Sequence, residues 1–200
     1  MAGPPGIGVT SLLTQMAAHL VQTARVGMAN DHMATHILRD RLLMAASSAG
    51  TDRTAVDRIE IASWIPIPDF RSDDPSWFGA DYDVLIIDCL DEMLRPRAWP
   101  RGPVAVLTGR WLREMARRSN TALILTARGD RPPDDGRWSF EGAWQSHWAR
   151  PVFDDIADVQ LSLWESGESR VGLHATARGY GHIEGSLRPW MDGHLILHPD

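Results

Sequence analysis

Near its start the chain reads Gly3-Pro4-Pro5-Gly6-Ile7-Gly8-Val9-Thr10. Two glycines separated by four residues, with a threonine two positions after the second, keep the spacing of a loop that wraps around a phosphate group. The glycines let backbone N–H groups approach phosphate oxygens, and a helix that follows offers the positive end of its dipole. The stretch therefore predicts a loop that leads into a helix and can cradle a phosphate.

One position of this loop departs from the phosphate-binding pattern. Val9 stands where such loops carry a lysine, whose ammonium group contacts the outer phosphates. All 20 basic residues of the chain are arginine, so no other lysine can take that place. The alternative interpretation is that this stretch is merely a flexible start of the chain. The apolar helical pattern directly behind the loop weighs against it.

The rest of the chain alternates between helical and strand-like patterns. Apolar residues at helical spacing predict a helix that begins at about Val9 to Ser11, and further helices over 33–48 and 103–118. Strand patterns lie at 25–29, 58–64, 82–88 and 121–126, with closing strands at 157–164, 170–177 and 194–197. The segment 129–151 is interpreted as a long loop.

This order of elements predicts an α/β fold, with a mostly parallel sheet flanked by helices and an antiparallel C-terminal extension. A chain of 200 residues, 44% hydrophobic, suits one domain, so residues 1–200 are expected to form a single unit. Only two residues precede Gly3, although a strand normally leads into such a loop. Either that first strand is absent, or the chain is a fragment of a longer product.

Composition excludes several classes of protein. The single cysteine, Cys89, cannot form an internal disulfide and favours a reducing compartment, so a cytoplasmic location is expected. No segment approaches the roughly 18 apolar residues that a membrane span needs, and no membrane partner is expected. The net charge of −6 means that any contact with DNA must come from a local basic patch.

A second motif complements the loop. The apolar run 84–87 ends in Asp88, and a carboxylate at the end of a buried strand holds magnesium beside a phosphate-binding loop. Asp88 is therefore expected beside Thr10, with both as metal ligands, although a buried strand that ends in an acid also occurs for structural reasons alone. The expected cofactors are ATP and Mg²⁺, held by Gly3, Gly6, Gly8, Val9, Thr10, Ser11 and Asp88.

Several segments, taken in order, resemble the core of DnaB-type replicative helicases. They are the glycine-rich loop, 33–43, 86–93, 112–120 and 156–159, which together span nearly the whole chain. The resemblance implies a RecA-like P-loop NTPase fold and a ring of subunits around single-stranded DNA, with ATP bound between neighbours. The implied partners are single-stranded DNA and either further copies of this chain or a related helicase-like subunit.

The departures from this family fall in its catalytic machinery. The resemblance implies a catalytic glutamate where His32 stands, with Asp31 beside it, and a phosphate-sensing glutamine where Arg128 stands. The basic pair that the family donates to a neighbour's nucleotide becomes Thr176 and Arg178. Since loss of one catalytic group typically lowers a rate by a factor of ~100 or more, ATP hydrolysis is expected to be impaired. The candidate catalytic residues are Asp31, His32, Arg128 and Arg178.

Two arginine- and tryptophan-containing segments are the candidate DNA contacts. Arginine neutralises phosphates and tryptophan stacks on bases, although exposed tryptophans also mark protein interfaces and acidic residues dilute the second segment. The candidate residues are Arg95, Arg97, Trp99 and Arg101 in the first segment, and Arg131, Arg137 and Trp138 in the second.

Three hypotheses remain open from the sequence. The chain is a degenerate helicase-class domain with impaired hydrolysis, an active ring helicase that uses arginine in place of the loop lysine, or a non-enzymatic interaction module that keeps only the fold. The second predicts that Arg128→Ala or Arg178→Ala abolishes turnover.

Overall fold

The computed structural model describes residues 2–3, 7–30, 32–62, 81–89, 103–128, 156–165, 171–178, 181–189 and 195–198. The helices in this part are α1 (Val9–Leu20), α2 (Thr35–Ser48), α3 (Arg53–Val56) and α5 (Pro103–Ser119). The strands are β1 (Ala2–Gly3), β2 (Val26–Asn30), β3 (Glu60–Ala62), β4 (Val84–Asp88), β5 (Ala122–Leu125), β6 (Ala127–Arg128), β7 (Val159–Glu165), β8 (Val171–Ala177), β9 (Gly181–Pro189) and β10 (Leu195–His198).

The strands form two sheets that share one segment of chain. The first has the order β3-β2-β4-β5 and is parallel throughout, and the second has the order β10-β9-β8-β7-β1-β6. Only Thr126 separates β5 from β6, so this segment passes directly from one sheet to the other. β1 pairs in parallel with β6 and β7, whereas β7 to β10 are antiparallel. The predicted α/β architecture with an antiparallel C-terminal extension is confirmed.

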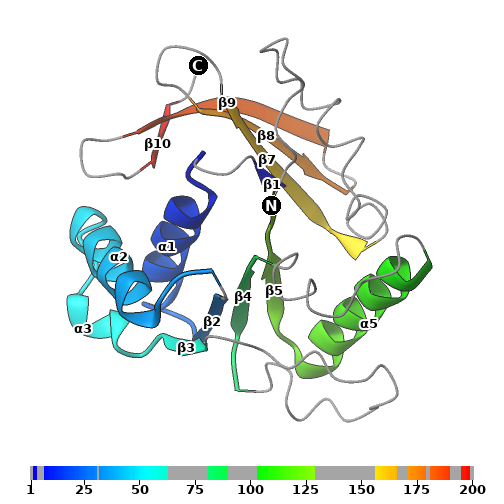
Figure 1. Cartoon of the computed structure of the whole chain (residues 1–200), viewed down its shortest axis with the longest axis horizontal. Coiled ribbons are helices and arrows are strands. Elements are labelled where there is room, and N and C mark those ends of the chain that lie inside the picture. Colours follow the sequence, from blue (N-terminus) through cyan, green and yellow to red (C-terminus); the bar gives the residue numbers. More distant parts are fainter. Residues whose placement is uncertain are drawn as a thin grey trace.

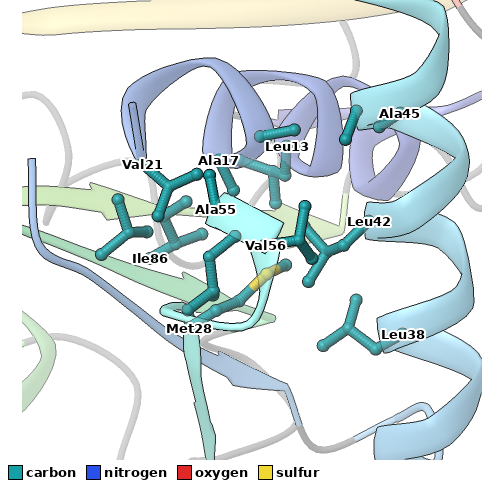
Figure 2. Close-up of a cluster of buried hydrophobic side chains, with 14 of the residues drawn as sticks. Leu13, Ala17, Val21, Met28, Leu38, Leu42, Ala45, Ala55, Val56 and Ile86 are labelled. Carbon is teal, nitrogen blue, oxygen red and sulfur yellow. The ribbon is translucent and has the colours of Figure 1, made fainter. Parts of the chain in front are cut away.

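Helices cover both sides of the parallel strands. Figure 1 shows α1, α2 and α3 grouped on one side of β2 and β4, with α5 on the other side. Figure 2 shows side chains of α1, α2 and α3 pointing toward those of β2 and β4: Leu13, Ala17, Val21, Leu38, Leu42, Ala45, Ala55, Val56, Met28 and Ile86. All are at most 5% exposed, and burial of one leucine side chain contributes about 2 kcal/mol. This cluster fixes α1, and with it the phosphate-loop motif, on the sheet.

A second apolar cluster joins the start of α1 to the antiparallel strands. Its buried members, Leu163, Val171 and Leu187, come from β7, β8 and β9, and Ile7 and Val9 pack against them. Val9 also packs against the first cluster. The valine at the lysine position therefore bridges the two apolar clusters.

Most elements lie close to their predicted positions, but β1, α3, β6 and β9 were not predicted. The nine-residue strand β9 was not predicted, because its alternation of polar and apolar residues extends only over 182–184, between Gly181 and Gly185. The four-residue helix α3 is too short to display a helical period. Ahead of the glycine-rich loop, the structure contains β1 as a two-residue strand. In the described part of the chain, no helix is long and apolar enough to cross a membrane.

A close contact at the amino-terminal side of the parallel sheet depends on a glycine. A Cβ atom added at Gly27 would lie 2.9 Å from three ring atoms of Tyr82. The Tyr82 hydroxyl donates a hydrogen bond of 2.6 Å to Glu60 Oε2 in β3. Burial, followed by this hydrogen bond to Glu60, raises the pKa of Tyr82 to about 12, so the phenol stays protonated and remains a donor.

Gly27→Ala is expected to lower the free energy of unfolding by roughly 1–3 kcal/mol, because the added methyl group overpacks against the Tyr82 ring. Urea unfolding followed by circular dichroism measures this change. In a Tyr82→Ala background the ring is gone, so the same glycine substitution is expected to cost much less. Equal losses in both backgrounds would show that the contact is not the cause.

Candidate functional site

The glycine-rich loop enters α1 through a residue that must be glycine. Gly8 is the N-cap of α1 and has a φ of 101°, a left-handed conformation that side-chain-bearing residues rarely adopt. Val9, Thr10 and Ser11 form the first turn, where backbone N–H groups have no partner inside the helix. These N–H groups and the helix dipole together form an anion-binding end.

The structure brings Thr10 and Asp88 together. Asp88 is the last residue of β4 and is only 2% exposed. The Thr10 hydroxyl donates a hydrogen bond of 2.9 Å to Asp88 Oδ2. The acid-tipped strand therefore ends at the first turn of α1, in the arrangement expected from the two motifs.

Two further donors hold the same carboxylate, and neither was found from the sequence. Asn30 Nδ2 donates to Asp88 Oδ2 at 3.1 Å, and the Thr126 hydroxyl donates to Asp88 Oδ1 at 2.7 Å. Both residues are 1% exposed. Asn30 pairs with Asp88 in the parallel ladder, and Thr126 donates its backbone N–H to Ile87 at the end of β4. The ends of three neighbouring strands thus converge on one carboxylate.

His32 lies at the edge of this group. Its Nε2 atom is 3.8 Å from Asp88 Oδ2, and its side chain is 21% exposed. The loop that carries His32 is tied to the site, because Asn30 Oδ1 accepts a hydrogen bond of 2.8 Å from the backbone N–H of Met33. Asn30 therefore contacts both the carboxylate and the loop of the candidate catalytic position.

The electrostatics of the site favour a bound cation. Within the described part of the chain, the hydrogen-bond donors to Asp88 are two hydroxyls and an amide, all neutral, and the basic group within 4 Å is the His32 imidazole. A buried carboxylate is costly unless a positive charge compensates it. A divalent cation beside Asp88 would supply that compensation.

The residues fit a magnesium ion but not every part of a nucleotide site. Mg²⁺ prefers oxygen ligands, and Thr10 and Asp88 offer a hydroxyl and a carboxylate 2.9 Å apart. The first turn of α1 can additionally donate N–H groups to phosphate. Val9 offers no charge for the outer phosphates, and its side chain packs between the two apolar clusters instead. The two oxygen ligands expected for a metal lie side by side, whereas apolar packing replaces the charge at the lysine position.

The remaining candidates lie on other elements or outside the described residues. Gly3 pairs with Arg128 between β1 and β6. Arg178 follows β8, is exposed, and donates its backbone N–H to the Asp158 carbonyl at 2.8 Å. Gly6, Asp31, the Arg128 side chain and all the candidate DNA contacts, Arg95, Arg97, Trp99, Arg101, Arg131, Arg137 and Trp138, lie outside the described part.

Known proteins resemble this chain in fold but not in sequence. No family model and no curated protein matches the sequence. Among solved structures, the chain is similar to the ATPase domain of a DnaB-like helicase, with a TM-score of 0.68 and 14% identity over 99% of this chain and 83% of that one.

Two further solved structures show the same similarity. A RadB recombinase matches with a TM-score of 0.65 and 14% identity, over 96% of this chain and 86% of its own. A DnaB-like replicative helicase, solved in work on its interactions with primase, matches with a TM-score of 0.68 and 15% identity. The match covers 98% of this chain and 56% of that helicase. The chain therefore has the RecA-like fold of DnaB-like helicase ATPase domains and RadB-type recombinases.

Proposed function

We propose that this chain is a DnaB-like, helicase-class P-loop domain that binds magnesium-nucleotide weakly and hydrolyses ATP very slowly or not at all. It acts through contacts with single-stranded DNA and with further copies of itself or a related helicase-like subunit. The observation that carries the proposal is the buried Asp88 carboxylate, hydrogen-bonded to Thr10 at the start of α1, with Val9 packed in the apolar clusters.

Nucleotide binding is supported by the parts of the site that remain. Thr10 and Asp88 provide magnesium ligands, and the left-handed Gly8 directs the first turn of α1 so that its N–H groups can face a phosphate. The binding is weak because no ammonium group shares the charge of the outer phosphates. We infer an affinity sufficient for binding at millimolar nucleotide.

Slow hydrolysis is supported by the residue at the position of the base. His32 occupies the place of the glutamate that the helicase resemblance implies. An imidazole can accept a proton only when it is neutral, whereas the carboxylate of a glutamate is already an acceptor at neutral pH. His32 is therefore a poor base for activating water.

Millimolar magnesium-ATP is expected to raise the melting temperature of the protein by a few degrees, because a ligand that binds only the folded state stabilises it. Thr10→Ala removes a metal ligand and is expected to abolish the shift. Thr23→Ala, which alters an exposed threonine just after α1, is the matched control and should keep it. Differential scanning fluorimetry measures all three proteins.

Absence of a shift in the unaltered protein would contradict nucleotide binding and favour an interaction module that keeps only the fold. The DNA part of the proposal is tested separately, by the fluorescence anisotropy of a labelled single-stranded oligonucleotide. Affinity should fall as salt rises, because binding releases counterions from the phosphates.

A further inference from the structure

A histidine, His32, lies next to the two candidate metal ligands Thr10 and Asp88. Asp88 Oδ2 lies 2.9 Å from the Thr10 hydroxyl and 3.8 Å from the Nε2 atom of His32. Magnesium takes oxygen ligands, whereas imidazole nitrogen is a preferred ligand of zinc, cobalt and nickel. Replacing an acid by histidine at this position therefore changes the class of cation that the site suits.

We propose that Thr10, His32 and Asp88 bind a divalent first-row transition metal, of the cobalt and zinc class, in preference to magnesium. This inference rests on the proposed nucleotide site, because it names the cation that accompanies the phosphates there. It also makes a claim that can be tested with the metal alone.

The distances from Asp88 to Thr10 and to His32 are close to those between ligands of one shared ion. A metal that binds oxygen and nitrogen at roughly 2.1 Å holds its adjacent ligands roughly 3–3.5 Å apart, and further apart at wider angles. The Thr10 to Asp88 distance of 2.9 Å and the His32 to Asp88 distance of 3.8 Å lie close to this range. Shifts of a few tenths of an ångström at Thr10 and at His32 would bring both distances into this range.

Asn30 fixes the histidine and the carboxylate relative to each other. Its amide donates to Asp88 Oδ2 at 3.1 Å, while its carbonyl oxygen accepts from the backbone N–H of Met33 at 2.8 Å. Because Asn30 is buried at 1% exposure and belongs to β2, the loop of His32 is held against the end of β4. Hydrogen bonds of this kind, made to a ligand by residues behind it, raise metal affinity.

The protein supplies only part of a coordination sphere. Among the described residues, no group of three or more His, Cys, Asp or Glu side chains is placed to hold a metal. The proposed site has one imidazole, one carboxylate and one hydroxyl, so water or nucleotide phosphate must complete it. The His32 nitrogen then determines which cation is preferred, since the Thr10 and Asp88 oxygens can bind magnesium as well as a transition metal.

The first test uses metal chloride without nucleotide on the EDTA-treated protein. Co²⁺ and Zn²⁺ are expected to raise the melting temperature at concentrations at least ~10-fold below those at which Mg²⁺ does so. His32→Ala should remove most of this preference and leave the response to Mg²⁺ unchanged. His36→Ala, which alters an exposed histidine on α2, is the matched control and should keep the preference.

The second test reports the ligands directly. Titration of Co²⁺ into the unaltered protein is expected to give visible absorption bands that move when His32 is replaced by Gln and stay in place for His36→Ala. Equal responses to Co²⁺ and Mg²⁺, or a Co²⁺ spectrum unchanged by His32→Gln, would overturn the proposal. Stabilisation by Co²⁺ without any stabilisation by magnesium-ATP would support the metal site and contradict the proposed nucleotide function, so the two failures are distinguishable.

Discussion

Magnesium-ATP hydrolysis by the purified protein is expected to stay ~10⁴-fold below that of an intact site of this kind. The loop lysine is replaced by Val9 and the base by His32, and the loss of each such group typically lowers a rate ~100-fold. Phosphate release, measured with and without single-stranded DNA, checks this expectation. Hydrolysis that DNA stimulates to the level of a working helicase would contradict it.

Restoring the missing groups one at a time separates their effects. Val9→Lys alone is expected to strengthen nucleotide binding with little gain in turnover, because the base is still absent. The double variant Val9→Lys/His32→Glu is expected to gain ~100-fold over Val9→Lys. If the unaltered protein proves active, Arg178→Ala tests whether arginine supplies the missing charge, and retained activity in that variant would exclude Arg178.

Asp88→Ala is expected to lower the free energy of unfolding by about 3 kcal/mol, because Thr10 at the start of α1 and Asn30 and Thr126 at the strand ends all lose their hydrogen-bond acceptor. Because Thr126 and Asn30 are both 1% exposed, water cannot replace the hydrogen bonds that they lose. Urea unfolding monitored by circular dichroism measures the change. A variant as stable as the original would show that the network does not support the sheet.

Asp88→Asn is the matched control for this substitution. It keeps the shape of the side chain and one oxygen acceptor, and it removes the buried negative charge. With the amide nitrogen in place of Oδ1, the Thr126 hydroxyl can rotate to accept its hydrogen bond, while the remaining oxygen keeps the hydrogen bonds that Thr10 and Asn30 donate. A loss of stability smaller than that of Asp88→Ala is expected, while metal binding should be lost in both variants.

The pairing of the two phosphate-site motifs was predictable because each has a local pattern. Gly8 and Thr10 lie at fixed spacing ahead of a helix, and Asp88 ends an uninterrupted apolar strand. Parallel strands place their carboxyl ends at one edge of a sheet, so the approach of Thr10 to Asp88 followed from the fold. The geometry agrees with that expectation, and the roles assigned to these residues remain predictions.

The other members of the site could not be predicted, because their positions depend on strand order. Asn30 ends β2 and Thr126 directly follows β5, and they reach Asp88 only because β4 lies between those strands. No sequence pattern near either residue indicates that its polar side chain is buried. The packing of Val9 could not be predicted either, since it depends on β7, β8 and β9 folding back onto the start of α1.

The two-residue strand β1 has a consequence for how the protein is made. Ala2 pairs with Ala127 on one side and with Ser162 on the other, so the segment that leads into the glycine-rich loop is held by strands far along the chain. Contacts of such high sequence separation form late, and a growing polypeptide cannot form them before both partners have left the ribosome. The loop is synthesised before these strands but is therefore among the last parts to reach its final place, and a nascent chain that stops before β7 should be unable to bind nucleotide.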